Sequence, residues 1–360
     1  MNLLFLTYQG DLAGSTNSIA YLSKGLAERG HTVVVGCRRT SLLFELLQES
    51  KVIAYPMTFR HKLDGANRRQ IRDVVHQYQI DLINAQSSID RYTSIFAKWQ
   101  YKLSAKLIHT RRQTPKSVGG FLQNWFYVKG TDKIVCISPQ LKQTFVNKGF
   151  PSEHIQVIYN GLPAERFQQF SDDQVLALRQ KYDLSPDDLV IGCVSRLKNQ
   201  EQLIRALPYL PASIKVLFVG IQKGHFDELV QSLQIPNPII YAGKVSGKEV
   251  MNYYKLMQVK VLPSTMDGFG LVLVEAMVMG TPVVGTRYEG IIDVLDEEKN
   301  GLWFEDDDVQ TLAEKINTVL FNQTERTRLI ENGKKAAFGR FSLQHTIDHY
   351  ERFFKQLIAK

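Results

Sequence analysis

Two acidic residues, Asp267 and Glu275, stand eight positions apart on either side of a glycine-bearing turn in the stretch 263–282. Carboxylates accept hydrogen bonds from hydroxyls, whereas the unpaired backbone N–H groups at the start of a helix bind anions such as phosphate. A short apolar run precedes the turn and a helix-length apolar run follows it. The spacing therefore predicts a site for an anionic ligand that also carries hydroxyls.

The turn itself supplies the expected phosphate donors. Glycine lets a ligand approach the backbone closely, so the donors would be the amides of Gly268, Phe269, Gly270 and Leu271. Asp267, ahead of the helix, and Glu275, about one turn inside it, would then accept hydrogen bonds from sugar hydroxyls. A capping role for Asp267 and a solvated Glu275 are the alternative that these two residues alone leave open.

The elements that must position these residues recur along the chain. Short apolar runs alternate with amphipathic helical stretches in the first half, and the same cycle restarts near residue 189. Such alternation predicts parallel sheets covered on both faces, and the segment YNGLP at 159–163 is typical of a break between two cycles. We expect an α/β protein with two doubly wound, Rossmann-like domains, at 1–162 and 163–342, and a last helix within 343–360.

Other polar residues follow expected strands, where open α/β sheets bind their ligands. Gly14 and Ser15 open a helix after the first strand, and Arg196 and Lys198 follow the first strand of the second domain. These two cations could neutralise a departing diphosphate. A charge pair at ~4 Å is worth about 4 kcal/mol at an effective dielectric of ~20.

Charge is unevenly divided along the chain. Residues 1–162 hold 21 Lys and Arg against 10 Asp and Glu, whereas residues 163–360 hold 23 against 26. Lys98, Lys102 and Lys106 are spaced by four, which predicts one basic helix face. Such a face is either simply solvated or attracted to anionic lipid headgroups or an anionic glycan. No nucleic-acid module accompanies it, so we expect no nucleic-acid partner and infer no obligate protein partner.

Cysteine usage and the apolar runs bear on the compartment. Cys37, Cys136 and Cys193 lie in apolar, strand-like runs without metal-ligand spacing. They are typical of reduced core thiols, and the N-terminal apolar run is too short for a signal peptide. No stretch approaches the ~20 apolar residues of a spanning helix. We expect a cytoplasmic protein without a metal site.

Several motifs resemble those of the retaining glycosyltransferases of family 4. The stretch PSTMDGFGLVLVEAMVMGTP at 263–282 is similar to the family's E-x7-E signature, with Asp267 where glutamate is more common. The segment YAGKV ending at Val245 is similar to an F-x-G-x-V motif along the nucleotide base. Arg196 and Lys198 resemble the family's R-L-x(n)-K pair, although they stand only two positions apart.

The resemblance implies a GT-B fold, with two domains facing across a cleft and the last helix crossing back onto the first domain. It implies retaining sugar transfer from a nucleotide-sugar donor to a glycan or glycolipid acceptor, as in bacterial polysaccharide or lipopolysaccharide assembly. UDP- or GDP-sugars are the expected donors, with no metal and no other cofactor. Family habit and the basic first half together suggest peripheral contact with the anionic inner face of the plasma membrane.

Residue roles follow from the same resemblance. Asp267 would contact the donor sugar, Glu275 the ribose, and Arg196 with Lys198 the diphosphate, while the loop at Gly14 and Ser15 would lie near the donor phosphates. These assignments place the donor chemistry in the second domain.

A histidine near the anomeric carbon is common in the family, and two alignments compete for it. One places His109 there, directly after a strand expected at 106–108, and the other places Arg112 there. Arginine stays protonated at neutral pH and cannot serve as a general base. Arg111 and Arg112 could instead bind an anionic donor sugar or acceptor.

Two other functions fit the same residues. One is a GT-B epimerase or phosphorylase, which shares the fold without transfer to a separate acceptor. The other is a degenerate relative that only binds a glycan or an anionic membrane, which the short interval from Arg196 to Lys198 and the presence of Asp267 would favour.

Overall fold

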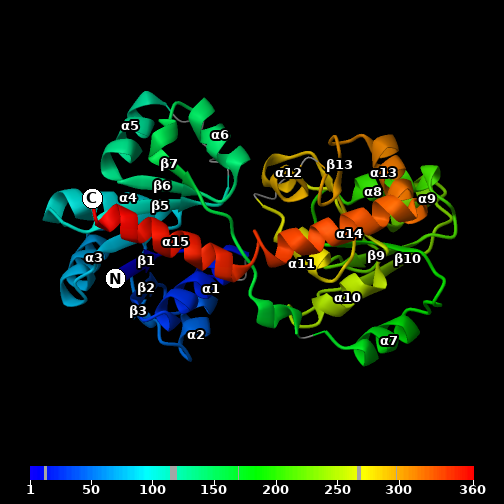
Figure 1. The fold of residues 1–360 in the computed structure, drawn as a ribbon, viewed down its shortest axis with the longest axis horizontal. Helices are drawn as coiled ribbons and strands as arrows, with labels where there is room; N and C mark the ends of the chain where they lie inside the picture. Colours follow the sequence, from blue (N-terminus) through cyan, green and yellow to red (C-terminus); the bar gives the residue numbers. More distant parts are fainter. Residues whose placement is uncertain (12–13, 114–119, 169, 266–268, 297) are drawn as a thin grey trace. The chain divides into compact units, whose positions relative to one another are not determined.

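The structure is a computed structural model, and it describes the chain except for residues 12–13, 114–119, 169, 266–268 and 297. It divides into two compact units, of which the first combines Met1–Gly161 with Leu343–Lys360 and the second is Leu162–Ser342. The division falls one residue before the expected boundary at 162/163. Each unit contains one parallel sheet with helices on both faces (Figure 1).

The sheet of the first unit has seven parallel strands in the order β3-β2-β1-β4-β5-β6-β7. Leu3 of the central strand pairs with Val33 on one side and Leu82 on the other, and all three side chains are buried. The near-continuous apolar runs thus reflect burial on both faces. The strands are β1 (Asn2–Leu6), β2 (Thr32–Cys37), β3 (Ile53–Pro56), β4 (Leu82–Ala85), β5 (Lys106–Arg111), β6 (Lys133–Cys136) and β7 (Ile155–Val157).

Helices connect these strands, and the last helix of the chain joins them. One face of the sheet packs against α1, α2 and α15 in a single apolar core that includes Phe5 and Phe354, whose ring centroids lie 6.5 Å apart. The helices are α1 (Gly14–Glu28), α2 (Leu42–Leu47), α3 (Gly65–Gln77), α4 (Ser88–Tyr101), α5 (Phe121–Gly130), α6 (Pro139–Asn147) and α15 (Leu343–Ile358), with a 3-10 turn η1 (Ser152–His154).

Charged side chains fasten α15 to the C-terminal end of α1. Arg29 pairs with Asp348 and, at 2.6 Å, with Glu351, and the ring of His31 lies 3.2 Å from Glu351. The helices approach closely, because a Cβ at Gly25 would lie 2.1 Å from the end of the Ile347 side chain. These contacts make α15 part of the first unit's structure.

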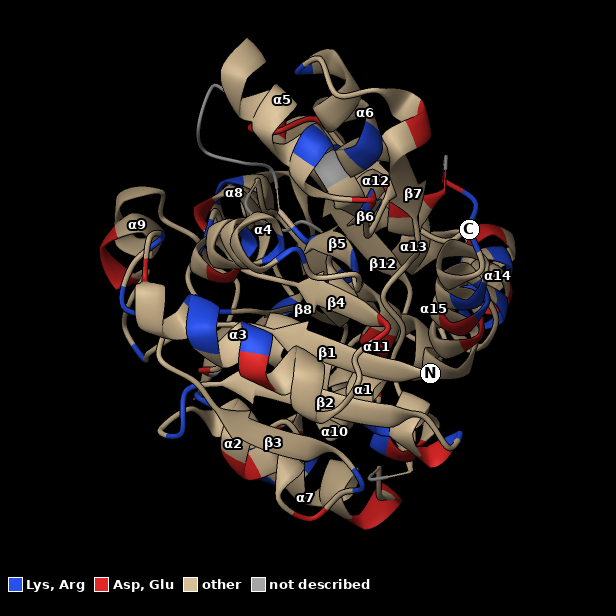
Figure 2. Cartoon of the chain, turned by 90° about the vertical axis from the view of Figure 1, so that its left-hand side faces the viewer, with Lys and Arg blue, Asp and Glu red and all other residues tan. Residues whose placement is uncertain are grey.

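The predicted basic helix face is wrong. Helix α4 ends at Tyr101, Lys102 takes a left-handed conformation with φ of 51°, and Lys106 opens β5. The amines of Lys98 and Lys106 instead lie 2.6 and 3.9 Å from the carboxylate of Asp132. Figure 2 shows basic residues along α3, where the sequence carries a separate arginine cluster.

The sheet of the second unit has six parallel strands in the order β10-β9-β8-β11-β12-β13. The strands are β8 (Val190–Val194), β9 (Lys215–Val219), β10 (Ile239–Gly243), β11 (Val259–Leu262), β12 (Val283–Thr286) and β13 (Leu302–Phe304). The helices are α7 (Asp172–Lys181), α8 (Glu201–Ala206), α9 (Asp227–Ser232), α10 (Val250–Leu256), α11 (Leu271–Val278), α12 (Glu289–Leu295), α13 (Val309–Phe321) and α14 (Gln323–Phe338), with 3-10 turns η2 (Ala164–Phe167) and η3 (Leu207–Tyr209).

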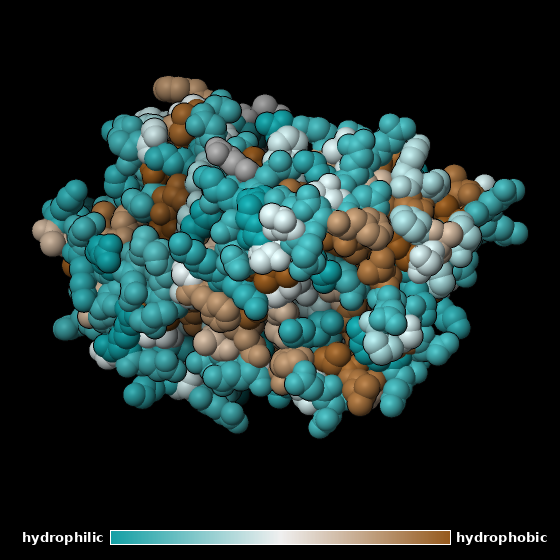
Figure 3. Space-filling model, turned by 45° about the vertical axis from the view of Figure 1, so that its right-hand side comes forward, coloured by the Kyte–Doolittle hydropathy of each residue, from teal (hydrophilic) through white to brown (hydrophobic). Residues whose placement is uncertain are grey.

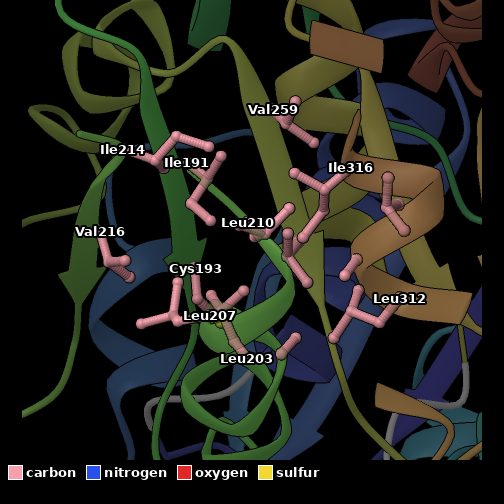
Figure 4. Close-up of a cluster of buried hydrophobic side chains, with 14 of the residues drawn as sticks. Ile191, Cys193, Leu203, Leu207, Leu210, Ile214, Val216, Val259, Leu312 and Ile316 are labelled. Carbon is pink, nitrogen blue, oxygen red and sulfur yellow. The ribbon is translucent and has the colours of Figure 1, made fainter. Parts of the chain in front are cut away.

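One hydrophobic cluster of the second unit joins strands of this sheet to α8 and α13. Ile191 and Val259 from neighbouring strands pack with Leu203 of α8 and with Leu312 and Ile316 of α13 (Figure 4). Hydrophilic residues dominate the face shown in Figure 3, with hydrophobic patches between them. Within the described residues, no helix is long and apolar enough to cross a membrane.

Candidate functional site

Both sheets reverse their strand order at a central pair, and several of the predicted site residues follow the strands of that pair. The reversal falls between β1 and β4 in the first unit and between β8 and β11 in the second. Ligands of open α/β sheets bind beyond the carboxyl ends of the strands at such a reversal. The turns after these strands therefore define one candidate site in each unit.

In the second unit, a buried glutamine shapes the turn after β8. The amide nitrogen of Gln200 donates to the Ser195 hydroxyl at 2.7 Å and to the Arg196 carbonyl at 2.8 Å, and its oxygen accepts from the Lys198 backbone N–H at 2.6 Å. Gln200 is fully buried, Lys198 is half-buried and Arg196 is exposed. The short interval between the two cations is thus a compact turn that leaves the Arg196 guanidinium accessible.

Backbone hydrogen bonds join this turn to those after β9 and β10. Ser195 donates to the Val219 carbonyl at 3.1 Å, and Gly220 donates to the Gly243 carbonyl at 2.7 Å. Gly220 has a φ of +96°, and a Cβ there would lie 2.5 Å from the Ser195 oxygen, so this position requires glycine. Val245 is half-buried two residues beyond β10. The three turns form one continuous edge.

The turn after β11 contacts the turn after β8 directly. The Asn199 amide donates to the Thr265 hydroxyl at 3.3 Å, so the segments that carry Arg196 and the acidic signature lie side by side. Asp267 and Gly268, predicted to contact the sugar and the phosphates, lie outside the described residues.

The remaining residues of the predicted anion-binding turn begin α11. Gly270 is its N-cap in the left-handed conformation, with φ of 69° and ψ of 47°, and Leu271 is its first residue. The ring of Phe269 is buried against Phe341, with 5.4 Å between the centroids. The expected order of strand, turn and helix is therefore confirmed on both sides of the undescribed residues.

Glu275 is a buried carboxylate that contacts a guanidinium and a phenol hydroxyl. It is 5% exposed, its Oε1 lies 2.6 Å from an Arg166 nitrogen, and its Oε2 accepts a 2.8 Å hydrogen bond from the Tyr254 hydroxyl. Burial and the Glu275 charge raise the pKa of Tyr254 well above its ordinary value, so this hydroxyl stays a donor. The alternative of a solvated Glu275 is wrong. Sequence reasoning missed Arg166 and Tyr254, because each is far from Glu275 along the chain.

In the first unit, a pocket of about 350 Å³ lies beyond the carboxyl ends of β1, β4 and β5. None of its described lining residues is acidic, whereas four are cationic. Polar and aromatic side chains complete the lining, among them Ser15, Ser87, Tyr92 and Tyr127, and the four cations are Lys62, Arg91, Arg111 and Arg112. Such a lining suits an anionic ligand.

The structure separates the residues predicted around β5. This strand extends to Arg111, so the expected strand end at Ile108 is wrong, and His109 lies inside the strand. His109 is fully buried with its ring against Tyr127, 5.7 Å between centroids, and it does not line the pocket. Burial and the charges of Arg111 and Arg91 hold the pKa of His109 well below its ordinary value. Arg111 and Arg112 do line the pocket.

The predicted glycine turn also reaches this pocket. Helix α1 begins at Gly14, and Ser15 lines the pocket from the first turn of the helix. A Cβ at Gly14 would meet no atom within 4 Å, so the described surroundings do not require glycine there. Lys62 belongs to the basic excess of the first half, but sequence reasoning missed Arg91, although it stands in the first turn of the helix that follows β4.

Two parallel-sheet α/β units, each with a candidate site at its strand reversal, define a GT-B fold. Residues 12–166 match the family described as Glycosyltransferase Family 4, and residues 175–336 match Glycosyl transferases group 1. The two matches cover most of the chain, which belongs to the family 4 glycosyltransferases.

Individual relatives are more distant. An uncharacterized glycosyltransferase of Methanocaldococcus jannaschii, MJ1607, is 28% identical over 58% of this chain and 56% of its own length. The capsular polysaccharide biosynthesis glycosyltransferase CapM of Staphylococcus aureus is 27% identical over 63% of this chain and 62% of its own length. The aligned region thus spans less than two thirds of both relatives.

A solved structure matches almost the whole chain. Anabaena Alr3699/HepE, crystallised in complex with UDP, gives a TM-score of 0.84 over 99% of this chain and 100% of that chain, at 22% sequence identity. At this identity the likeness shows the shared fold.

Proposed function

We propose that this chain transfers a sugar from a nucleotide-sugar donor to a hydroxyl of a glycan or glycolipid acceptor, with retention of anomeric configuration. The donor would bind the second unit and the acceptor the first. The observation that carries the proposal is the buried carboxylate of Glu275, which lies in helix α11 at the strand reversal and contacts Arg166 and Tyr254. The UDP bound to the structurally similar HepE supports a nucleotide donor.

Glu275 is well placed to bind the hydroxyls of the nucleotide's ribose. Each carboxylate oxygen has two acceptor positions, and the contacts to Arg166 and Tyr254 occupy one on each oxygen. The remaining positions would accept ribose hydroxyls, and the fixed carboxylate needs no rearrangement to do so. Asp267 would bind hydroxyls of the transferred sugar.

The diphosphate would lie on the turn after β8 and on the amides that open α11. Arg196 and Lys198 would offset the negative charge that grows on the diphosphate as the sugar departs. In this front-face reaction the acceptor oxygen bonds to the anomeric carbon while the bond to the phosphate oxygen breaks. That phosphate oxygen takes the acceptor's proton, so the step needs neither a metal nor a protein base.

Arg112, not His109, would occupy the family's histidine position at the pocket of the first unit. The pocket lining includes Arg112 and excludes the buried His109. A guanidinium there would bind negative charge on the acceptor or donor and would not remove a proton.

The donor assay tests this proposal most directly. Purified protein is offered UDP- and GDP-sugars in turn with EDTA present, and release of nucleoside diphosphate is measured. We expect turnover of at least one donor, and a loss of about tenfold or more in Glu275→Ala and in Arg196→Ala. If both variants turned over the donor as fast as wild type does, the site assignment would be rejected. Failure to bind any sugar nucleotide in calorimetry would favour a degenerate binding protein.

We further propose a role in surface polysaccharide or lipopolysaccharide assembly in the cytoplasm, with peripheral attachment to an anionic membrane. The relative CapM supports the first part. For the second, α5 exposes Phe121, Leu122 and Trp125 by 82, 77 and 51%, in a unit with a basic excess. Exposed apolar and basic residues together suit an anionic interface. Vesicles with anionic lipid should retain the protein at low salt, and less of it after Phe121→Ser with Leu122→Ser.

A further inference from the structure

The pocket of the first unit gathers cations that no lining acid balances. Arg91, Arg111 and Arg112 line it with Lys62, and none of the described lining residues is Asp or Glu. Among ion pairs between described residues, none includes any of the three arginines. Charge buried without a counter-ion is costly, and titratable groups perturbed in this way cluster at functional sites.

Of the three arginines, Arg111 is buried and Arg91 and Arg112 are half-buried. Arg111 is 6% exposed, its guanidinium lies 4.8 Å from the Tyr127 ring centroid, and its Nε has no hydrogen-bond partner among the described residues. The Nε of Arg112 also lacks a partner there, while its Nη1 donates to the Gln86 side chain. Donors therefore remain unused on both guanidinium groups.

The three charges persist at neutral pH although burial disfavours each of them and Arg111 repels Arg91. Burial and the Arg111 charge lower the pKa of Arg91 to about 10, and burial lowers the pKa of Arg111 and Arg112 as well. Arginine begins from a pKa near 12.5, so all three groups remain protonated. The free protein thus holds repelling cations at one place.

Asp90, the neighbour of Arg91 in the chain, accepts hydrogen bonds from backbone N–H groups. Its Oδ1 accepts from the Tyr8 backbone N–H at 3.2 Å, and its Oδ2 accepts from those of Gln86 and Ser87, both at 2.7 Å. This carboxylate fastens the turns after β1 and β4 and caps α4. One acid against three arginines and a lysine leaves the pocket positive.

We infer that this pocket binds a phosphate group carried by the acceptor, an inference that rests on the proposed function in taking the ligand to be the acceptor. A phosphate dianion would offset the excess charge, and arginine forks match its oxygens in pairs. A volume of about 350 Å³ leaves room for a sugar-sized group beside the phosphate. The acceptor would thus be either a soluble sugar phosphate or a lipid with a phosphate headgroup.

Phosphate binding to the full chain tests the site without any donor. Inorganic phosphate is titrated into wild type, Arg111→Gln and Arg91→Gln in low-salt buffer by calorimetry. We expect binding to weaken about tenfold to hundredfold in each variant. Arg69→Gln, which removes the same charge from an exposed position on α3, is the matched control and should bind as wild type does.

Four results would overturn the inference. One is wild-type binding in both pocket variants, another is an equal loss in Arg69→Gln, and the third is no phosphate binding by wild type. A loss confined to Arg196→Ala would place the phosphate in the second unit and would overturn it as well. Unfolding temperatures guard against a folding defect, because Arg111→Gln removes an unbalanced charge and should not lower the unfolding temperature of the free protein.

Two further measurements identify the source of the phosphate and separate this inference from the proposed function. Retention on phosphatidylcholine vesicles that contain phosphatidic acid, lost in Arg111→Gln, would support a lipid acceptor. Competition of glucose 6-phosphate with inorganic phosphate, together with vesicle retention that Arg111→Gln leaves unchanged, would support a soluble acceptor. Phosphate binding that depends on Arg111 in a protein that turns over no donor would reject the proposed function and leave the anion site. Donor turnover without such binding would reject the site alone.

Discussion

At the scale of single residues, Glu275 shows how a buried charge can be kept ready for a ligand. Glu275 is 5% exposed, and its carboxylate contacts both a guanidinium and a phenol. Leaving one partner of a buried pair alone costs about 3–5 kcal/mol, whereas replacing both can be nearly neutral. Stability and donor binding can therefore be separated by experiment.

We predict that Glu275→Gln loses donor turnover and also destabilises the protein by about 3–5 kcal/mol, because the substitution breaks the buried ion pair with Arg166. The double variant Glu275→Gln with Arg166→Met should regain most of the stability and none of the turnover. Urea unfolding and nucleoside diphosphate release measure the two effects. Recovery of turnover in the double variant would mean that Glu275 serves only the fold.

Gly270 carries a second prediction at this scale. Its φ of 69° is in the left-handed region, while a Cβ there would meet Leu262 and Leu273 at an ordinary 3.4 Å. Gly270→Ala should therefore cost about 1–2 kcal/mol from backbone strain alone. Gly14→Ala, which adds a Cβ where none of the described atoms lies within 4 Å, should change stability by less than about 0.5 kcal/mol. Equal costs in urea unfolding would contradict this explanation.

Site residues could be predicted from the sequence where a local pattern alone determines their position. Glycine at the helix entry, acids around it and cations after a strand are all local patterns, and the structure places the described ones at the strand reversals. The residue at which a strand ends is not set by a local pattern, because it depends on pairing with a neighbouring strand. Strand β5 continues to Arg111 through pairing with β6, which buries His109 and moves the accessible position to Arg112.

Helix ends and distant pairs show the same limit at the scale of elements. The lysine spacing suggested a basic helix face, but α4 ends at Tyr101 and Lys102 adopts the left-handed conformation. The Arg166 contact with Glu275 and the cluster of Arg91 with Arg111 depend on how strands are ordered in each sheet. No pattern along the chain encodes these distances.

Between elements, the fastening of α15 to α1 predicts a pH dependence. Hydrogen bonds from Lys355 and Arg29 hold the pKa of Glu351 at about 2, below its ordinary 4.5. A lowered folded-state pKa means that the carboxylate stabilises the fold above pH 4.5, and that this contribution is lost as pH falls toward 2. Glu351→Gln should therefore cost about 1–2 kcal/mol at pH 7 and progressively less between pH 4.5 and 2.

Denaturant unfolding at several pH values measures this difference. Glu28→Gln is the matched control, since Glu28 is exposed on α1 and forms no ion pair with any described residue. The control should lie within about 0.5 kcal/mol of wild type at every pH. A cost for Glu351→Gln that does not change with pH would show that packing, not charge, explains the effect.

At the scale of the whole molecule, the chain completes its first unit with its last helix. Ile347, Tyr350, Phe354 and Leu357 of α15 are buried in the core formed with α1, α2 and the first sheet. Burying each such side chain contributes about 1.5–3 kcal/mol, so the four together approach the 5–15 kcal/mol that stabilises a whole domain. The first unit cannot be expected to fold stably without them.

We predict that a chain ending at Ser342 loses its first unit and keeps its second. Residues 162–342 form their own sheet and core, so amide hydrogen exchange in β8 and β11 should remain slow, and UDP should still slow it further if the donor binds there. Exchange in β1 and β2 should rise to near the unprotected rate, and phosphate binding should disappear. Full-length protein with Lys360→Ala, an exposed change beyond the end of α15, provides the comparison. An equal loss of protection from hydrogen exchange in β8 and β1 would mean that the two units depend on one another to fold. That result would contradict the assignment of donor binding to the second unit and acceptor binding to the first.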